Sequence, residues 1–149
     1  MTFSYDYNQS IGYLTSLASR SLSQRLASRF VEEGIDMTAE QWGALLILAN
    51  EAPLTQGELA ERLRLEKSSV SRLIDRLEKR SWIARTSDFR DSRRKIVVPT
   101  AAAEQLLERC IVIAREVLEE AQVGMDEEER RAMRQSLARV IANLETLAG

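Results

Sequence analysis

Arginine, lysine and serine side chains are concentrated in one part of this 149-residue chain. Residues 62–95 hold 12 Lys/Arg and 5 Asp/Glu, a net charge of +7, whereas all other residues hold 9 and 18, a net charge of −9. The stretch DFRDSRRK (88–95) alone holds four cations and two acids. Guanidinium and ammonium groups gathered in this way are typical of a surface that binds a polyanion. A loop that is only solvated is the alternative interpretation of the same stretch.

The residues that most enzymes use for acid–base or nucleophilic chemistry are scarce. The chain has no histidine and one cysteine, Cys110, so it lacks the residues for a His-based triad, a Cys–His dyad or a zinc site. Cys110 lies in the aliphatic run LLERCIVIAREVL, which predicts a buried thiol rather than a redox sensor. The sequence has no G-x-G-x-x-G motif and no P-loop. We therefore expect no catalytic residue, no metal and no cofactor; an enzyme that uses carboxylates alone is the remaining enzymatic alternative.

The segment KSSVSRLIDRLEKR (67–80) has the pattern of an amphipathic helix. The spacing of three and four places its apolar residues on one face, and these are Val70, Leu73, Ile74 and Leu77. The other sides begin with the small hydroxyls Ser68, Ser69 and Ser71 and continue with Arg72 and Arg76. Small side chains in the first turn permit a close approach to the major groove of DNA. An ordinary solvated helix face would have a similar composition.

The polar residues of this segment suit separate contacts with DNA. Arg72 could pair with guanine through two hydrogen bonds, or it could pair with Asp75 or Glu78 one turn away. The serine hydroxyls could reach phosphates or base edges, and the helix N-terminus offers free backbone N–H groups to a phosphate. Lys67, Arg76 and Lys79 are better placed as phosphate contacts. The basic segment as a whole favours the DNA interpretation.

Hydrophobic periodicity predicts helices before and after this segment. Residues 8–33 form a first helix that ends at Gly34. Capping side chains mark where later helices begin: Thr38 with Gln41, Thr55 with Glu58, and Asp126. Helical patterns also cover residues 101–123 and 126–147. The runs SWIART (81–86) and RKIVVP (94–99) predict two strands on either side of DFRDSRRK, and this order of elements is that of a winged helix-turn-helix.

The stretch from about residue 35 to residue 100 resembles the core of the MarR family of bacterial transcription regulators. The residues that carry the resemblance are LTQGELAERL, SSVSRLIDRLEKR and RDSRRK, in this order and spacing. The resemblance implies one mainly α domain, 1–149, with a small two-stranded β-wing. It places a winged helix-turn-helix over 36–99 (helix-turn-helix about 55–79, wing about 82–98) between helical dimerisation arms at 8–33 and 101–149. It also implies a homodimeric repressor that binds a palindromic operator in double-stranded DNA.

Within the wing, the resemblance assigns Arg93 to the minor groove and Asp91 to holding that arginine in position. A guanidinium suits a narrow minor groove because the potential there is strongly negative. We expect Arg90 and Arg94 to contact phosphates. The complete set of expected DNA-binding residues is Thr55, Gln56, Lys67, Ser68, Ser69, Ser71, Arg72, Arg76, Arg90, Asp91, Arg93 and Arg94.

Two residues depart from the family pattern. Ser81 stands where the family commonly has glycine after the recognition helix, and a left-handed backbone there is less favourable for serine than for glycine. PTAAAE, with Pro99, replaces the family's Leu-Thr-x-x-Gly, which bears on the orientation of the helix that follows.

The arms carry more apolar residues than one chain of this length is expected to bury. In the last helix Leu137, Val140, Leu144 and Leu147 lie three and four apart, a spacing that suits a helix seam with a second copy, although packing within one chain is the alternative. The resemblance also implies a small aromatic or phenolic effector between arms and DNA-binding lobe. Residues that could line such a site, or serve only in the core or the dimer interface, are Tyr7, Tyr13 and Trp42.

The chain has no apolar run near the roughly 20 residues of a membrane span, and MTFSYDYNQS lacks the pattern of a signal peptide. We therefore expect a cytoplasmic protein with no membrane partner. The main functional alternative to a DNA-binding regulator is a winged-helix module whose basic surface binds an acidic protein.

Overall fold

The computed structural model describes residues 4–148 and contains six α-helices and one two-stranded antiparallel sheet. The elements in chain order are the 3-10 turn η1 (Tyr7–Gln9), α1 (Ile11–Glu32), α2 (Ala39–Glu51), α3 (Gln56–Leu63), α4 (Lys67–Lys79), β1 (Ile83–Ser87), β2 (Lys95–Pro99), α5 (Ala101–Ala121) and α6 (Glu127–Ala148). The mainly α fold class with a β-wing is confirmed. Within residues 4–148, no helix is both long and apolar enough to cross a membrane.

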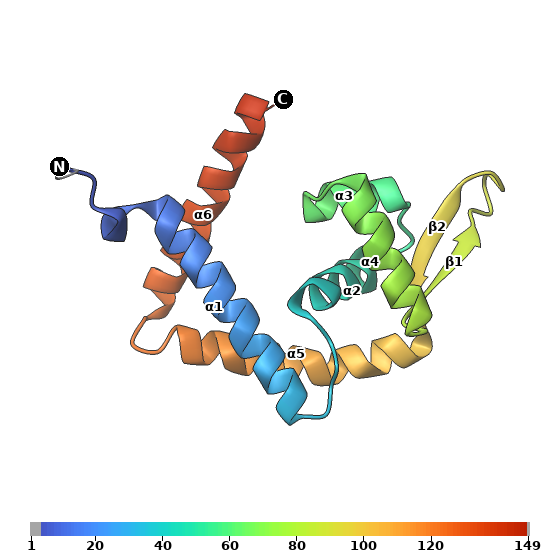
Figure 1. The fold of residues 1–149 in the computed structure, drawn as a ribbon, viewed down its shortest axis with the longest axis horizontal. Coiled ribbons are helices and arrows are strands. Elements are labelled where there is room, and N and C mark those ends of the chain that lie inside the picture. Colours follow the sequence, from blue (N-terminus) through green and yellow to red (C-terminus); the bar gives the residue numbers. More distant parts are fainter. Residues whose placement is uncertain (1–3, 149) are drawn as a thin grey trace.

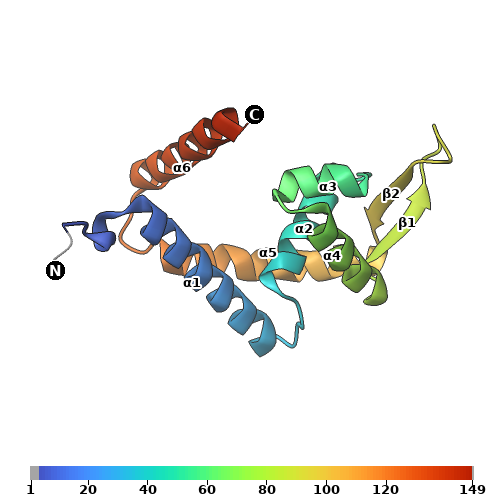
Figure 2. The same cartoon turned by 45° about the horizontal axis from the view of Figure 1, so that its top comes forward.

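Helix α5 connects two parts of the molecule that lie at its opposite ends (Figure 1). At one end α2, α3, α4 and the two strands form a compact lobe. At the other end α1 and α6 form an arm, and the N-terminal part of α1 and the first turns of α6 lie away from the lobe (Figures 1 and 2). The side chain of Arg64, at the end of α3, nevertheless reaches α6 and forms an ion pair with Glu145, with Nη2 and Oε1 2.6 Å apart.

The lobe is held together by a continuous apolar core. The predicted apolar face of α4 is buried completely against α2 and α3 and under the strands, as the 3.6-residue period requires. The core residues of the lobe are Ala44, Leu45, Leu48, Leu54, Leu59, Ala60, Val70, Leu73, Ile74, Leu77, Trp82, Ile83 and Val97. This packing fixes α4 with one particular side facing outward.

Three helices end in the same way, with one residue in the left-handed region. These residues are Gly34 (φ 73°), Arg64 (φ 51°) and Ser81 (φ 59°). After each, the next residue donates a backbone hydrogen bond to the carbonyl five residues earlier, for example Trp82 N to Leu77 O at 3.0 Å. This is the Schellman arrangement, which satisfies carbonyls that the helix leaves free. The expected left-handed strain at Ser81 is therefore present.

The ends of the first helix and of the strands differ from the sequence prediction. The helix begins at Ile11 rather than at residue 8, because the Asp6 carboxylate caps a separate 3-10 turn and Ser10 is extended. The first strand begins at Ile83 rather than at residue 81, because Ser81 and Trp82 complete the end of α4. Both capping boxes, at Thr38 and at Thr55, are confirmed.

Helix α5 is anchored to the lobe at its first turn. The Thr100 hydroxyl donates to Ser81 O at 2.8 Å and accepts from Ala103 N at 3.2 Å, so one side chain caps α5 and ties it to the end of α4. Pro99 is the last residue of β2 and lies opposite Ile83. Although PTAAAE departs from the family pattern, a capped α5 therefore starts directly at the end of the strand.

The helices of the arm are buried to different extents, since α5 carries several buried residues and α6 carries none among the described residues. Helix α5 packs on α1 through apolar side chains and through the ion pairs Arg25–Glu120 and Arg29–Glu116. Cys110 on α5 is fully buried, as predicted. Helix α6 has no buried residue among those described, and it exposes Met133, Leu137, Ile141, Leu144 and Leu147.

Candidate DNA-binding surface

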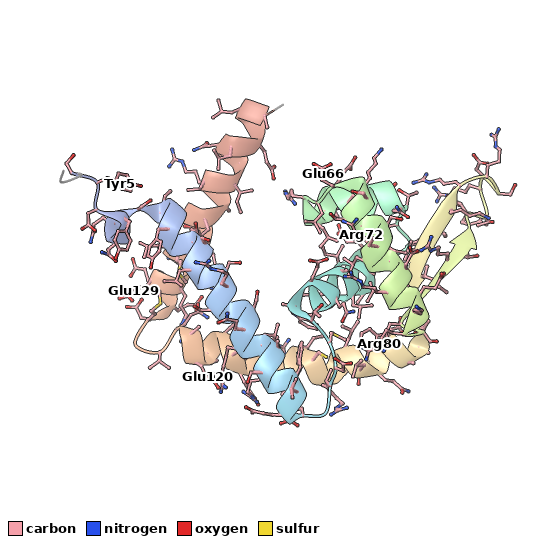
Figure 3. The ribbon with its side chains drawn as sticks, in the orientation of Figure 1. Tyr5, Glu66, Arg72, Arg80, Glu120 and Glu129 are labelled. Carbon is pink, nitrogen blue, oxygen red and sulfur yellow. The ribbon has the colours of Figure 1, made fainter. Side chains whose placement is uncertain are left out.

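The side of α4 opposite the core carries polar side chains only. Lys67, Ser68, Arg72 and Arg76 are exposed, and Ser69 and Ser71 are half-buried at its edges. Figure 3 labels Arg72 on α4, between Glu66 at the start of the helix and Arg80 at its end. After Lys67, the first residue of α4, the first turn carries the small side chains of Ser68 and Ser69, and Arg72 and Arg76 follow in the next turns, so the serines permit a close approach of the helix to a partner.

The N-terminus of α4 opens into a shallow cleft of about 590 Å³. Its lining is Arg64, Leu65, Glu66, Lys67, Ser68 and Ser69. Glu66 is the N-cap, but its side chain accepts no capping hydrogen bond, so the first N–H groups of this 13-residue helix have no side-chain partner. Free N–H groups at a helix N-terminus, next to a lysine and two hydroxyls, can hydrogen-bond to an anionic oxygen.

The acids of α4 are neutralised from the neighbouring strand. Arg85 on β1 forms ion pairs with Asp75 and, at 3.5 Å, with Glu78. These are the two acids with which Arg72 could have paired within its own helix. Among residues 4–148, Arg72 and Arg76 have no ion-pair partner, so their guanidinium groups are free to bind another molecule.

The wing consists of the antiparallel strands β1 and β2, and Asp88 and Asp91 accept backbone hydrogen bonds within the loop between them. The register places Ile83 opposite Pro99 and Ser87 opposite Lys95. In the loop, Asp91 Oδ1 accepts hydrogen bonds from Arg93 N at 3.0 Å and from Arg93 Nε at 3.2 Å. These bonds hold the pKa of Asp91 below its usual range. The side chains of Asp91 and Arg93 are thus in direct contact, and the Arg93 side chain is 91% exposed.

Arg94 points to a different place from Arg90 and Arg93. Its guanidinium forms an ion pair with Glu58 on α3 and lies 3.9 Å from Asp88. Glu58 also accepts a hydrogen bond from Thr55 N in the capping box, so this one carboxylate joins the start of α3 to the wing. This contact could not be predicted from the sequence, because no local pattern connects residues 36 positions apart.

Thr55 and Gln56 lie at the start of α3. The Thr55 hydroxyl accepts a hydrogen bond from Glu58 N at 3.1 Å, which uses its oxygen but leaves its proton available to an acceptor. Both side chains are half-buried. They lie beside the Arg94–Glu58 ion pair, which holds the wing against α3, rather than on the exposed side of α4.

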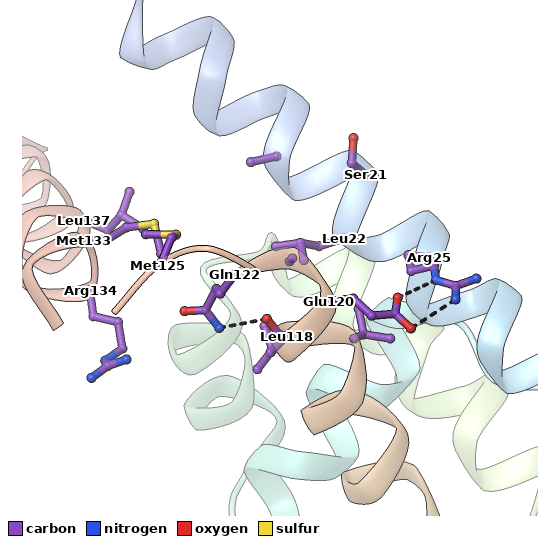
Figure 4. Close-up of a pocket in the computed structure, with 13 residues that line it drawn as sticks. Ser21, Leu22, Arg25, Leu118, Glu120, Gln122, Met125, Met133, Arg134 and Leu137 are labelled. Carbon is purple, nitrogen blue, oxygen red and sulfur yellow. Dashed lines mark hydrogen bonds and ion pairs between the residues drawn. The ribbon is translucent and has the colours of Figure 1, made fainter. Parts of the chain in front are cut away.

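Two cavities lie in and near the arm. The larger, of about 650 Å³, is lined by apolar side chains of α1, α5 and α6 and bordered by the Arg25–Glu120 ion pair (Figure 4). The smaller, of about 230 Å³, lies where α1, α2 and α5 meet, and Trp42 is part of its wall. Tyr7 and Tyr13 line neither cavity; their rings pack edge to face at 5.0 Å near the start of α1.

A two-helix motif with an outward cationic face, followed by an anchored basic hairpin, defines a winged helix-turn-helix protein. The model of the MarR family matches residues 35–94. Over 113 residues the chain is 32% identical to YwoH of Bacillus subtilis, an uncharacterized HTH-type transcriptional regulator, with 74% of this chain and 82% of that protein covered. Over 139 residues it is 27% identical to NicR, an HTH-type transcriptional repressor of Pseudomonas putida, with 92% and 85% covered.

Among solved structures, the S. aureus MepR–DNA complex is similar, with a TM-score of 0.80 and 26% identity over 93% of this chain and 99% of that one. The chain belongs to the MarR family. It is a DNA-binding transcriptional regulator, and its family and relatives indicate a regulator rather than an enzyme.

Proposed function

We propose that this regulator is a cytoplasmic homodimeric repressor that places α4 in the major groove and the wing in the minor groove of a palindromic operator. The observation that carries the proposal is the distribution of unpaired cations. Within the described residues 4–148, Lys67, Arg72 and Arg76 have no acidic partner, and all three lie on the exposed side of one helix. The name of the relative NicR supports repression as the direction of regulation.

Within this arrangement the residues have separate roles. Arg72 pairs with a guanine edge, and Ser68, Ser69 and Ser71 reach phosphates or base edges from the first turn. Lys67 and Arg76 contact phosphates, which fixes the register of the helix on the duplex. Thr55 and Gln56 at the start of α3 contact the backbone of the same groove.

In the wing, Arg93 enters the minor groove while Asp91 holds its guanidinium. Arg90 contacts a phosphate. Arg94 can do so only by exchanging its ion pair with Glu58 for a phosphate oxygen. We therefore expect the contribution of Arg94 to binding to be smaller than that of Arg93.

The exposed apolar residues of the arm support a dimer. Leu14 and Leu17 on α1 and Ile141, Leu144 and Leu147 on α6 are all more than a third exposed, and a second copy would cover them. A symmetric dimer presents two α4 helices to two half-sites. Sedimentation equilibrium should give twice the chain mass of 16.9 kDa, and Leu144→Glu should shift it towards one chain. A monomeric wild-type protein would contradict the proposal.

The cavity beside Trp42 is the proposed site of a small aromatic effector. It lies between the arm and the DNA-binding lobe, so a ligand there could change the angle between them. In a Trp82→Phe variant, fluorescence reports on Trp42 alone, and a phenolic acid such as 4-hydroxybenzoate should quench it and weaken DNA binding together. Quenching without any effect on DNA binding would argue against regulation through this cavity.

The decisive experiment is selection of bound duplexes from a random pool, followed by affinity measurements at several salt concentrations. Counterion release predicts a steep loss of affinity as salt rises. Arg93→Ala should weaken binding roughly tenfold or more, as expected for hydrogen bonds to a charged group. The matched control is Arg62→Ala, which removes a cation from the same basic segment that is already paired with Glu51 at 3.4 Å. Equal losses for both variants, or no enriched sequence, would refute the proposal.

A further inference from the structure

The tip of the wing exposes a large aromatic side chain. Phe89 is 90% exposed, more than any other large hydrophobic residue identified in the part of the chain that the structure describes. Within residues 4–148, Phe89 is not among the hydrophobic residues that form the core or pack against it, and its ring interacts with the guanidinium of Arg90. The Phe89 ring therefore adds nothing to the packing of the core, and it is accessible to a binding partner.

The backbone around Phe89 is held in place. Asp88 is only 14% exposed at its side chain; its N–H donates to Arg94 O at 2.8 Å, and its Oδ1 accepts from Arg90 N at 3.0 Å. Three residues after Asp88, Asp91 Oδ1 accepts the equivalent hydrogen bond from Arg93 N at 3.0 Å. Phe89 therefore projects from a loop braced on both sides, so its ordering costs little when a partner binds.

The charges beside the ring indicate the kind of partner. The guanidinium of Arg90 lies 5.4 Å from the centre of the Phe89 ring, and Arg93, in the same loop, has a side chain that is 91% exposed. An apolar group flanked by two exposed cations matches a surface on which anionic groups border an apolar floor. The minor groove of duplex DNA has this chemistry, because phosphates border sugars and base edges.

We propose that Phe89 is an apolar wedge that enters the minor groove beside Arg93 and partly separates a base step at the outer edge of each half-site. This proposal rests on the proposed function, since it requires the wing to lie in the minor groove. Inserted apolar side chains unstack a base step and bend the duplex. Pyrimidine–purine steps are the easiest to deform, so Phe89 gives the protein a preference for such a step without any hydrogen bond to a base.

The test compares Phe89→Ala with Phe89→Leu on the duplex that the wild-type protein selects. Stacking of an aromatic ring on bases predicts that the alanine variant binds roughly five- to a hundredfold more weakly, and the leucine variant falls between it and wild type. Because the ring is uncharged, the slope of log affinity against log salt should stay the same. Arg93→Ala should instead lower that slope by about one.

A second readout is fluorescence of 2-aminopurine placed at the flanking step, which rises when the base unstacks. We expect wild type to raise it and Phe89→Ala not to. If wild type selects no duplex, the proposed function fails; if Arg93→Ala weakens binding while Phe89→Ala leaves both affinity and fluorescence unchanged, only the wedge is wrong. Phe89 is outside the core, so thermal unfolding of the alanine variant should match wild type and exclude misfolding as the cause.

Discussion

Replacing Ser81 by glycine should stabilise the protein, because Ser81 holds a left-handed backbone at φ 59°. Only backbone atoms of this residue form the hydrogen bonds of the helix end: its N–H donates to Glu78 O at 2.9 Å, and its carbonyl accepts from the Thr100 hydroxyl at 2.8 Å. The side chain is exposed. Glycine therefore keeps every one of these contacts and removes only the Cβ that makes the conformation unfavourable.

Two effects of opposite sign set the size of the change. A left-handed conformation costs a residue with a Cβ about 1–2 kcal/mol. Glycine offsets about 0.4–1 kcal/mol of this gain, because the unfolded chain of the glycine variant has more conformations to lose on folding. The net expectation is a gain of roughly 0.5–1 kcal/mol in the free energy of unfolding, or about 1–4 °C in Tm for a chain of this size.

The assay is thermal and urea unfolding of wild type, Ser81→Gly and Ser81→Val at one protein concentration, since association makes Tm depend on concentration. Valine should lower Tm, because a β-branched side chain is poorly tolerated at positive φ. DNA affinity should stay unchanged in the glycine variant, as Ser81 follows α4 rather than lying on its exposed side. A glycine variant less stable than wild type, with a valine variant that unfolds like wild type, would refute a left-handed Ser81.

Three further outcomes follow from single contacts. Hydrogen bonds from Arg93 lower the pKa of Asp91, so its carboxylate stays charged down to low pH. The contribution of this charge to holding Arg93 is lost only as pH falls through that pKa. Asp91→Asn should therefore weaken DNA binding several-fold, and equally at pH 6 and pH 8, when binding is measured by fluorescence anisotropy. Glu58→Gln keeps an acceptor for the capping box but removes the charge that holds Arg94. Amide hydrogen exchange in residues 88–95 should therefore become faster, while the Tm falls by only a few degrees. Burial raises the pKa of Cys110 from 9.0 to about 11, so the stability that this group contributes is complete below about pH 9 and is lost as pH rises towards 11. Because the thiol is fully buried as well as protonated, iodoacetamide at pH 8.5 should alkylate the folded protein far more slowly than the unfolded chain.

Features that depend on residues close together in the chain could be predicted from the sequence. The capping boxes at Thr38 and Thr55 depend on side chains three positions apart, and both form as expected. The buried face of α4 follows from the helical period alone. The order of helices and strands followed from these local signals, which is why the fold class was predictable.

Features that depend on contacts between distant residues could not be predicted in the same way. Arg64 ends α3 in a left-handed conformation without the glycine that marks such an end at Gly34. Its ion pair with Glu145 joins residues 81 positions apart. The Arg94–Glu58 ion pair likewise depends on how the wing folds back on α3. Charge runs indicate where cations are, but only the folded chain determines which of them already have partners.

That distinction changes how the net charge of +7 over residues 62–95 should be interpreted. Much of it is used inside the protein, since Arg62, Arg64, Arg80, Arg85 and Arg94 all pair with acids of other elements or turns. The pairs formed by Arg85 matter most for the DNA-binding surface. Without them Asp75, which lies one turn from Arg72 on α4, would have no partner for its charge and would compete for the Arg72 guanidinium. Arg85 on β1 therefore leaves the guanidinium of Arg72 without a competing acid on α4, although Arg85 itself is not among the residues expected to contact DNA.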